Sequence, residues 1–140
     1  MIVKSYELNK INLKKNNNLY IDISQKNRSK LNSKIENNIK KFSNQNNENV
    51  IQLEISSNKK INIISKDKKG DPSRFGMTIS LTINILNKNN YEINKTKSFT
   101  EKFDYNNNSN KFSLKQYEKD IEDNLINKII ERSLIYLSEL

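Results

Sequence analysis

The sequence predicts a two-layer α+β sandwich, in which two helices pack on one face of a four-stranded, mostly antiparallel sheet in the order β-α-β-β-β-α. Two stretches repeat apolar residues at helical spacing, and the long middle of the chain alternates apolar and polar residues as strands do. Each pattern gives its element one apolar face. The helices and the sheet can bury these faces by packing against each other. At 140 residues the chain is predicted to form one domain, with an extended lead-in over 1–18 and the core over 19–140.

The first strand and the first helix follow the lead-in. Alternating apolar residues predict a strand over Leu19–Ser24. Asn27 or Ser29 is then placed to cap a helix, which the polar stretch 43–49 ends. That helix is predicted from four apolar residues at steps of four, four and three, namely Leu31, Ile35, Ile39 and Phe42.

Three consecutive strands follow as an antiparallel meander, with turns at 65–73 and 87–90. Gly76 lies within one of them and indicates a bulge or a close approach of neighbouring groups. One face of the meander is predicted to be apolar, and its members are Ile51, Leu53, Ile55, Ile61, Ile63, Phe75, Met77, Ile79, Leu81, Ile83, Ile85, Tyr91, Ile93, Phe99, Phe103 and Tyr105.

A long helix over 114–138 is predicted to end the chain. Ser113 and Gln116 have the spacing of a capping box, and Phe112 and Tyr117 stand at the positions of a hydrophobic staple. The apolar stripe that follows contains Tyr117, Ile121, Leu125, Ile126, Ile129, Ile130, Leu134 and Leu137.

The composition excludes several kinds of chemistry. The chain has no Cys and no His, so thiolate nucleophiles, Ser–His triads, disulfides and zinc sites of the usual ligands are excluded. Carboxylates are scattered, and no glycine-rich phosphate loop or calcium-loop pattern occurs. No apolar run approaches the ~20 residues of a membrane span. We therefore expect no catalytic activity, no cofactor and no metal.

The positive charge lies in one half of the chain. Residues 1–70 hold 15 Lys and Arg against 6 Asp and Glu, whereas residues 71–140 hold 10 of each. This asymmetry favours an anionic partner, such as nucleic acid, a phosphorylated lipid or an acidic protein. The alternative is that the positive charge reflects solubility together with codon bias, because the 26 Asn residues indicate an AT-rich genome.

The turn from Lys66 to Arg74 is the most unusual local feature. It gathers Lys66, Lys68, Lys69 and Arg74 around the only proline and one of the two glycines. A hairpin tip with four cations is suited to phosphates, and Arg74 has the geometry to grip one bidentately. The alternative interpretation is a solvated turn whose charges protect the strand ends from aggregation.

Nucleic-acid binding agrees with the basic pI of about 9.6. However, the solvent-facing strand positions Thr78, Ser80, Thr82 and Asn84 offer no aromatic platform for bases. We therefore do not expect nucleic acid as the partner, and keep a small basic nucleic-acid-binding or structural interaction domain as the alternative.

The layout resembles the LptE family of lipopolysaccharide-assembly lipoproteins, also called RlpB, over nearly the whole chain. The stretches that carry this resemblance are the lead-in Tyr6–Ile11, the helix stretch Asn27–Ile35, the meander opening Gly70–Phe75, the aromatic-flanked Phe103–Tyr105, and a long final helix ending at Leu137–Leu140.

The resemblance implies a non-enzymatic protein with this two-layer fold. Members of the family lie at the periplasmic face of the outer membrane, plug the lumen of the β-barrel LptD, and bind lipopolysaccharide through basic residues. The candidate lipopolysaccharide-binding residues in this chain are Lys66, Lys68, Lys69, Arg74 and Lys111.

The chain departs from that family at its start. Family members begin with a signal peptide that ends in an acylated cysteine, whereas this chain has no Cys and opens at Met1-Ile2-Val3-Lys4. We therefore expect a membrane association through a lipid anchor that is absent from this chain, either because the anchoring segment was removed or because the start site was misassigned.

Overall fold

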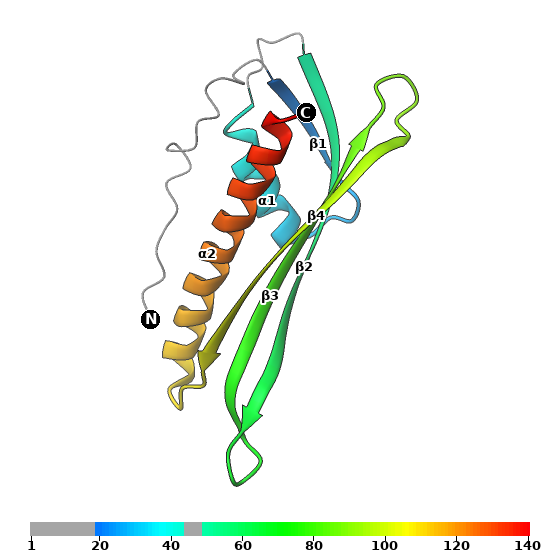
Figure 1. Cartoon of the computed structure of the whole chain (residues 1–140). Helices are drawn as coiled ribbons and strands as arrows, with labels where there is room; N and C mark the ends of the chain where they lie inside the picture. Colours follow the sequence, from blue (N-terminus) through cyan, green and yellow to red (C-terminus); the bar gives the residue numbers. More distant parts are fainter. Residues whose placement is uncertain (1–18, 44–48) are drawn as a thin grey trace.

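The structure is a two-layer arrangement of helices and strands (Figure 1). This computed structural model describes residues 19–43 and 49–140, so the lead-in predicted over 1–18 lies outside the described residues. The predicted class and element order are confirmed. The elements are β1 (Leu19–Gln25), α1 (Lys30–Lys40), β2 (Asn49–Lys66), β3 (Pro72–Leu86), β4 (Ile93–Asn106) and α2 (Lys111–Ser138).

The four strands form one sheet in the order β1-β2-β3-β4. β1 and β2 are parallel and are connected through α1, whereas β2–β3 and β3–β4 are antiparallel pairs joined by turns. The strands differ greatly in length. β2 has 18 residues, but β1 pairs only with its first part, Asn49–Ile55. Among the residues that the structure describes, the remainder of β2 therefore has a neighbouring strand on one side only.

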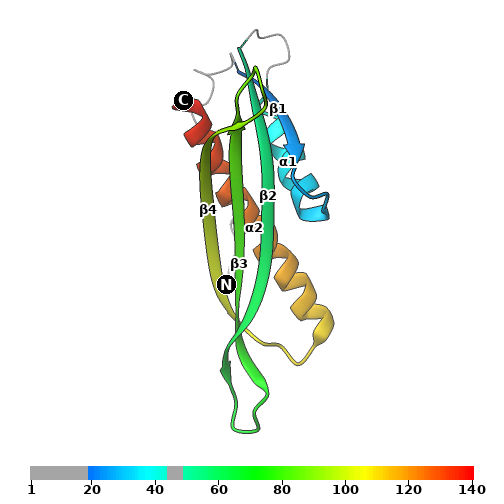
Figure 2. The ribbon, with the colours of Figure 1, turned by 90° about the vertical axis from the view of Figure 1, so that its right-hand side faces the viewer.

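The core lies between the sheet and the helices, which cover the same sheet face (Figure 2). On the central strand β3, Ile79, Leu81 and Ile83 have no exposed surface. Burying such a side chain stabilises the fold by ~1.5–3 kcal/mol. The buried apolar residues are Ile21, Ile35, Ile39, Leu53, Ile55, Met77, Ile79, Leu81, Ile83, Ile85, Phe99, Tyr105, Ile121, Leu125, Ile126, Ile129, Ile130, Leu134 and Leu137.

Side-chain caps determine where both helices begin. Ser29 caps α1, which confirms one of the two predicted alternatives, and its Oγ accepts a hydrogen bond of 3.0 Å from the Asn32 backbone N–H. α2 begins earlier than predicted, because Asn110 rather than Ser113 is its N-cap and accepts from the Ser113 N–H. The predicted capping box and staple are therefore wrong, and Phe112 is 73% exposed.

The helices do not cover the whole apolar face that the alternation predicts. Ile61 and Ile63, in the second half of β2, are 42% and 51% exposed. Tyr91 and Ile93, at the turn into β4, are also exposed. The expectation of a continuously dry face is wrong at both places. At Ile61 and Ile63 the reason is that β1 pairs with β2 only as far as Ile55, whereas Tyr91 and Ile93 lie where the chain turns from β3 into β4.

Polar contacts connect the two layers at the start of α1. Asn32 is 2% exposed, donates to the Asn27 carbonyl and accepts from the Ser57 hydroxyl on β2. Lys59 on β2 lies 3.1 Å from Glu122 on α2. These contacts align α1, β2 and α2 where the short helix begins.

A candidate ligand-binding hairpin tip

The candidate site is the tight turn between β2 and β3, built around Asp67. Its Oδ1 accepts hydrogen bonds of 2.9 Å from the backbone N–H groups of Lys69 and Asp71. The Asp67 N–H donates to the Asp71 carbonyl over 2.8 Å. Gly70 has a φ of +87°, a left-handed conformation that glycine adopts without a steric penalty. Asp67 therefore acts as scaffold, and its carboxylate is occupied by the turn.

The four predicted cations lie on and beside this turn. Lys66 ends β2, Lys68 and Lys69 lie in the turn, and Arg74 follows near the start of β3. All four side chains are exposed, and within residues 19–43 and 49–140 none of them forms an ion pair. The hairpin extends beyond the start of α2 (Figure 1), so these cations project from one end of the molecule.

The fifth candidate, Lys111, is brought to the same end by the β4–α2 connection. The Asn107 N–H donates to the Ser73 carbonyl over 2.9 Å, and its side-chain amide donates to the Pro72 carbonyl over 2.8 Å. The connection is thereby fastened to the root of the tip. Lys111 is exposed in the first turn of α2 (Figure 1). Residues 37 positions apart in the chain, Arg74 and Lys111, therefore belong to one basic end.

An aromatic cluster supports the root of the tip. The rings of Phe75 and Tyr105 lie 5.7 Å apart, and those of Tyr105 and Tyr117 lie 6.0 Å apart in an edge-on arrangement. The Tyr105 hydroxyl donates to the Glu118 carboxylate. Burial, together with this hydrogen bond, raises the pKa of Tyr105 well above its usual value, and burial also raises the pKa of Tyr117. The sequence carries no local signal for the Tyr105–Glu118 contact.

Because of this contact, we expect the folded protein to lose stability at alkaline pH. Above about pH 10 the unfolded chain releases the Tyr105 proton while the folded chain retains it, so the unfolded state binds fewer protons and stability falls as pH rises. We expect Tyr105→Phe to lower the free energy of unfolding by about 1–2 kcal/mol at neutral pH and to lose less stability above pH 10. Urea unfolding from pH 8 to pH 11 measures both effects. Tyr91→Phe, at a 63% exposed position, is the matched control, and a wild-type alkaline slope in Tyr105→Phe would contradict the assignment.

The sheet face opposite the helices is polar along β3 and β4. Ser80 and Thr100 hydroxyls lie 3.1 Å apart, and Thr82 and Ser98 hydroxyls lie 3.0 Å apart. Thr96 donates to Asn84 over 2.7 Å. Ser80, Thr82 and Asn84 are thus hydrogen-bonded to their neighbours across the strands, but the expectation that Asn84 faces solvent is wrong, because it is only 8% exposed. This part of the face offers hydroxyls and amides rather than aromatic rings.

Gly76 confirms the predicted close approach. A Cβ at this position would lie 2.9 Å from Ile64 Cδ1 and 3.0 Å from the Asp104 carboxylate. Ile64 is the extra residue of the irregularity in the β2–β3 pairing. Because Gly76 has no side chain, the bulge residue Ile64 can place its own side chain over β3 next to the hairpin tip.

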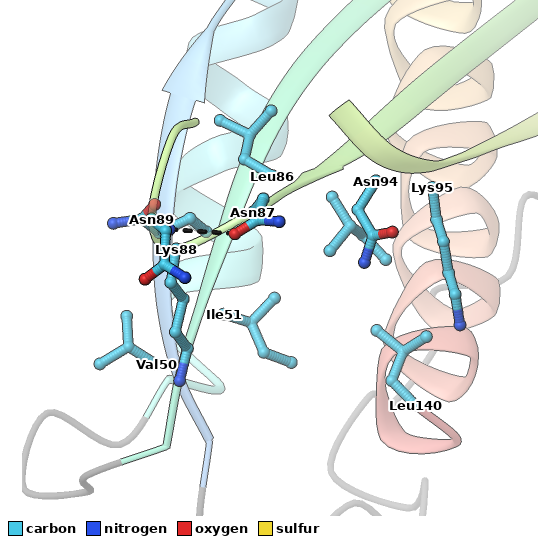
Figure 3. A pocket seen from close by; sticks show the side chains of 11 residues that line it. Val50, Ile51, Leu86, Asn87, Lys88, Asn89, Asn94, Lys95 and Leu140 are labelled. Carbon is cyan, nitrogen blue, oxygen red and sulfur yellow. Dashed lines mark hydrogen bonds between the residues drawn. The ribbon is translucent and has the colours of Figure 1, made fainter. Parts of the chain in front are cut away.

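A shallow open pocket lies at the opposite end of the molecule, where the β3–β4 turn diverges from β2 (Figure 3). Its volume is about 660 Å³. Ile51, Leu86 and Leu140 provide apolar walls, and Lys88 and Lys95 stand at its rim. Lys95 lies on the otherwise apolar face of β4, as does Lys97, whose Nζ lies 5.9 Å from the Tyr136 ring centre. This cation–π contact places the Lys97 side chain against the last turns of α2.

In the part of the chain that the structure describes, no group of three or more Asp and Glu residues is arranged to hold a metal ion. None of the helices in that part has the length and apolar character needed to cross a bilayer.

The fold is shared with a class of small bacterial proteins that are described as lipoproteins. A minor lipoprotein from Acinetobacter baumannii superposes with a TM-score of 0.61 and 11% identity, covering 86% of this chain and 90% of its own. Lipoprotein B from Nitrosomonas europaea gives 0.61 and 13%, covering 85% and 81%. The rare lipoprotein B of Shewanella oneidensis gives 0.57 and 8%, covering 86% and 97%.

These similarities establish a common fold over most of each chain. No protein-family model and no curated protein sequence matches this chain. None of the three solved proteins carries an enzyme's name.

Proposed function

We propose that this protein is a non-enzymatic accessory of lipopolysaccharide transport, which plugs the lumen of an LptD-type barrel and binds lipopolysaccharide through its basic tip. The observation that carries the proposal is that Lys66, Lys68, Lys69 and Arg74 are exposed at the hairpin between β2 and β3, which lies at one end of the molecule (Figure 1), and form no ion pair within the described residues. Lipid A presents phosphates, which Lys meets as a point charge and Arg grips bidentately. Lys111 adds a fifth cation at the same end.

The polar sheet face supports the plug part of the proposal. The lumen of outer-membrane barrels is lined by polar side chains. The outer side of β3 and β4 offers hydroxyls and amides that are already paired among themselves, such as Ser80–Thr100 and Thr82–Ser98. Such a face suits a wet, polar wall, because it needs no apolar partner.

The shared fold gives independent support. The family that the sequence resembles is also known as RlpB, and one structural neighbour is described as rare lipoprotein B. In this proposal the protein acts at the periplasmic face of the outer membrane, where members of the LptE family are held by a lipid anchor.

Co-expression with the LptD barrel of the same organism tests the plug. We expect a stoichiometric complex that survives purification in detergent and at high salt, because a plug buries a large surface rather than a few exposed ion pairs. No complex between a folded chain and a folded barrel would contradict the proposal. Affinity for oligonucleotides that falls steeply with salt, in the absence of a barrel complex, would favour the nucleic-acid alternative.

A further inference from the structure

In the described part of the chain, the second half of β2 is an open sheet edge. The Lys26 N–H donates to the Ile55 carbonyl over 2.9 Å, and this is the last position at which the β1 side of β2 is paired. Backbone groups alternate sides along a strand, so those of Ser57, Lys59 and Ile61 also point away from β3. Within the described residues no strand pairs with β2 beyond Ile55 on that side.

The two helices lie differently with respect to this edge. α1 lies beside the first half of β2, whereas α2 begins on the β1 side of β2 and crosses behind the sheet towards β4 (Figure 2). Ile61 pairs with the buried Met77, and Ile63 pairs with Phe75, yet both isoleucines are about half exposed. Within residues 19–43 and 49–140, this part of the edge therefore has no neighbouring strand, and Ile61 and Ile63 are only partly covered.

At the β4 edge of the sheet, a side chain from α2 bonds to the outward backbone. On β4 the Arg132 guanidinium donates to the outward carbonyl of Thr100 over 3.1 Å and lies 5.4 Å from the Phe99 ring centre. α2 thus covers that edge with a long side chain. On the β2 edge, Lys59 forms an ion pair with Glu122 on α2. Its side chain is therefore directed to α2 and not to the backbone around Ile61.

The charge of the free edge indicates what it accepts. Ser56–Lys66 contains three lysines and no acidic residue. A second copy paired through this edge would bring six lysines together, which like-charge repulsion disfavours. An acidic strand would be attracted, and Lys60 and Lys66 form no ion pair within the described residues.

We propose that the β2 edge from Ser56 to Lys66 binds an extended segment of a different protein, in which aliphatic and acidic side chains alternate. Strand addition would satisfy the outward backbone groups of Ser57, Lys59 and Ile61. The aliphatic side chains would pack over Ile61 and Ile63 on the helix side, and the acidic side chains would face Lys60 on the opposite side. The proposal is independent of the function proposed above.

A peptide tethered beside the edge tests the proposal directly. Because the chain has no cysteine, Lys68→Cys provides a single attachment point next to the end of β2. A peptide of alternating Val and Glu, joined by a short Gly-Ser linker through a disulfide, reaches an effective concentration of about millimolar at the edge. A Val-Lys peptide on the same linker is the matched control.

Amide hydrogen exchange, resolved by NMR, is the readout. With the Val-Glu peptide we expect at least tenfold slower exchange at Ser57, Lys59 and Ile61, and unchanged rates at Ser98 and Lys102 on the β4 edge. With the Val-Lys peptide we expect no slowing. No slowing with either peptide, or equal slowing with both, would overturn the proposal.

A backbone variant separates strand pairing from loose attachment. Ile61→Pro removes one outward N–H and leaves the bonds to β3 in place, since that N–H does not face β3. We expect it to abolish the slowing at Ser57 and Lys59. Undiminished protection in this variant, with an unchanged pattern of exchange in the core, would show that the peptide pairs elsewhere and would overturn the assignment.

Discussion

Replacing Lys66, Lys68, Lys69 and Arg74 together with glutamine is expected to weaken lipopolysaccharide binding about 30-fold at low salt. Four solvent-exposed ion pairs of about 0.5 kcal/mol each amount to ~2 kcal/mol, and 1.4 kcal/mol corresponds to a factor of ten in Kd. The fold should be unaffected, because all four side chains are exposed. Surface plasmon resonance on lipopolysaccharide-containing vesicles measures the Kd, and the salt dependence should become shallower in the variant.

The first helix offers a matched control for charge. Arg28, Lys30, Lys40 and Lys41 are also three lysines and one arginine, all exposed, and they lie at the ends of α1 rather than on the tip. Changing these four to glutamine removes the same net charge. If the two variants lose affinity equally, binding depends on net charge and the site assignment to the tip fails.

Leu81→Ala is expected to destabilise the protein by about 3–4 kcal/mol. Leu81 lies in the middle of the central strand, has no exposed surface, and pairs with Ser57 on one side and Phe99 on the other. Truncation leaves a cavity that the neighbouring strands are too constrained to fill, and Leu→Ala changes in such cores cost ~2–5 kcal/mol. The thermal midpoint should fall by roughly 10–15 °C for a domain of this size.

The control for the core variant is an apolar residue that the structure leaves in solvent. Ile93 belongs to the same predicted apolar face but is 57% exposed. Ile93→Ala should change the free energy of unfolding by less than about 0.5 kcal/mol. Equal losses in Leu81→Ala and Ile93→Ala, measured by urea or thermal unfolding, would show that the burial described for this face is wrong.

The local patterns of the chain predict most of the fold. Alternation along 72–86 identifies β3 and its buried side, because the side-chain period of a strand is two whatever it packs against. Ser29 as a helix cap depends on its own hydroxyl and on a backbone N–H three residues ahead, which is equally local. The predicted start of α2 is wrong because Asn110 and Ser113 are both good caps. The choice between them depends on the connection from β4 that Asn107 fastens to β3.

The candidate site is predictable in composition but not in arrangement. The cations from Lys66 to Arg74 are adjacent in the chain, so a turn is enough to gather them. Lys111 joins that end only because β4 returns antiparallel to β3 and delivers α2 there. The hydrogen bond from Tyr105 to Glu118 likewise depends on how α2 packs against β4, so no spacing rule in the sequence indicates it.

The sequence by itself determined which residues form helices and strands, which side of each strand is apolar, and that the chain carries a basic turn. Only the tertiary structure decided how much of that apolar side is covered. Ile55 and Ile61 have the same parity and the same side-chain type, yet Ile55 is fully buried and Ile61 is 42% exposed. The physical reason is a mismatch in length. β2 has 18 residues, whereas β1 has 7 and α1 has 11, so within residues 19–43 and 49–140 no strand pairs with the second half of β2 on its free edge.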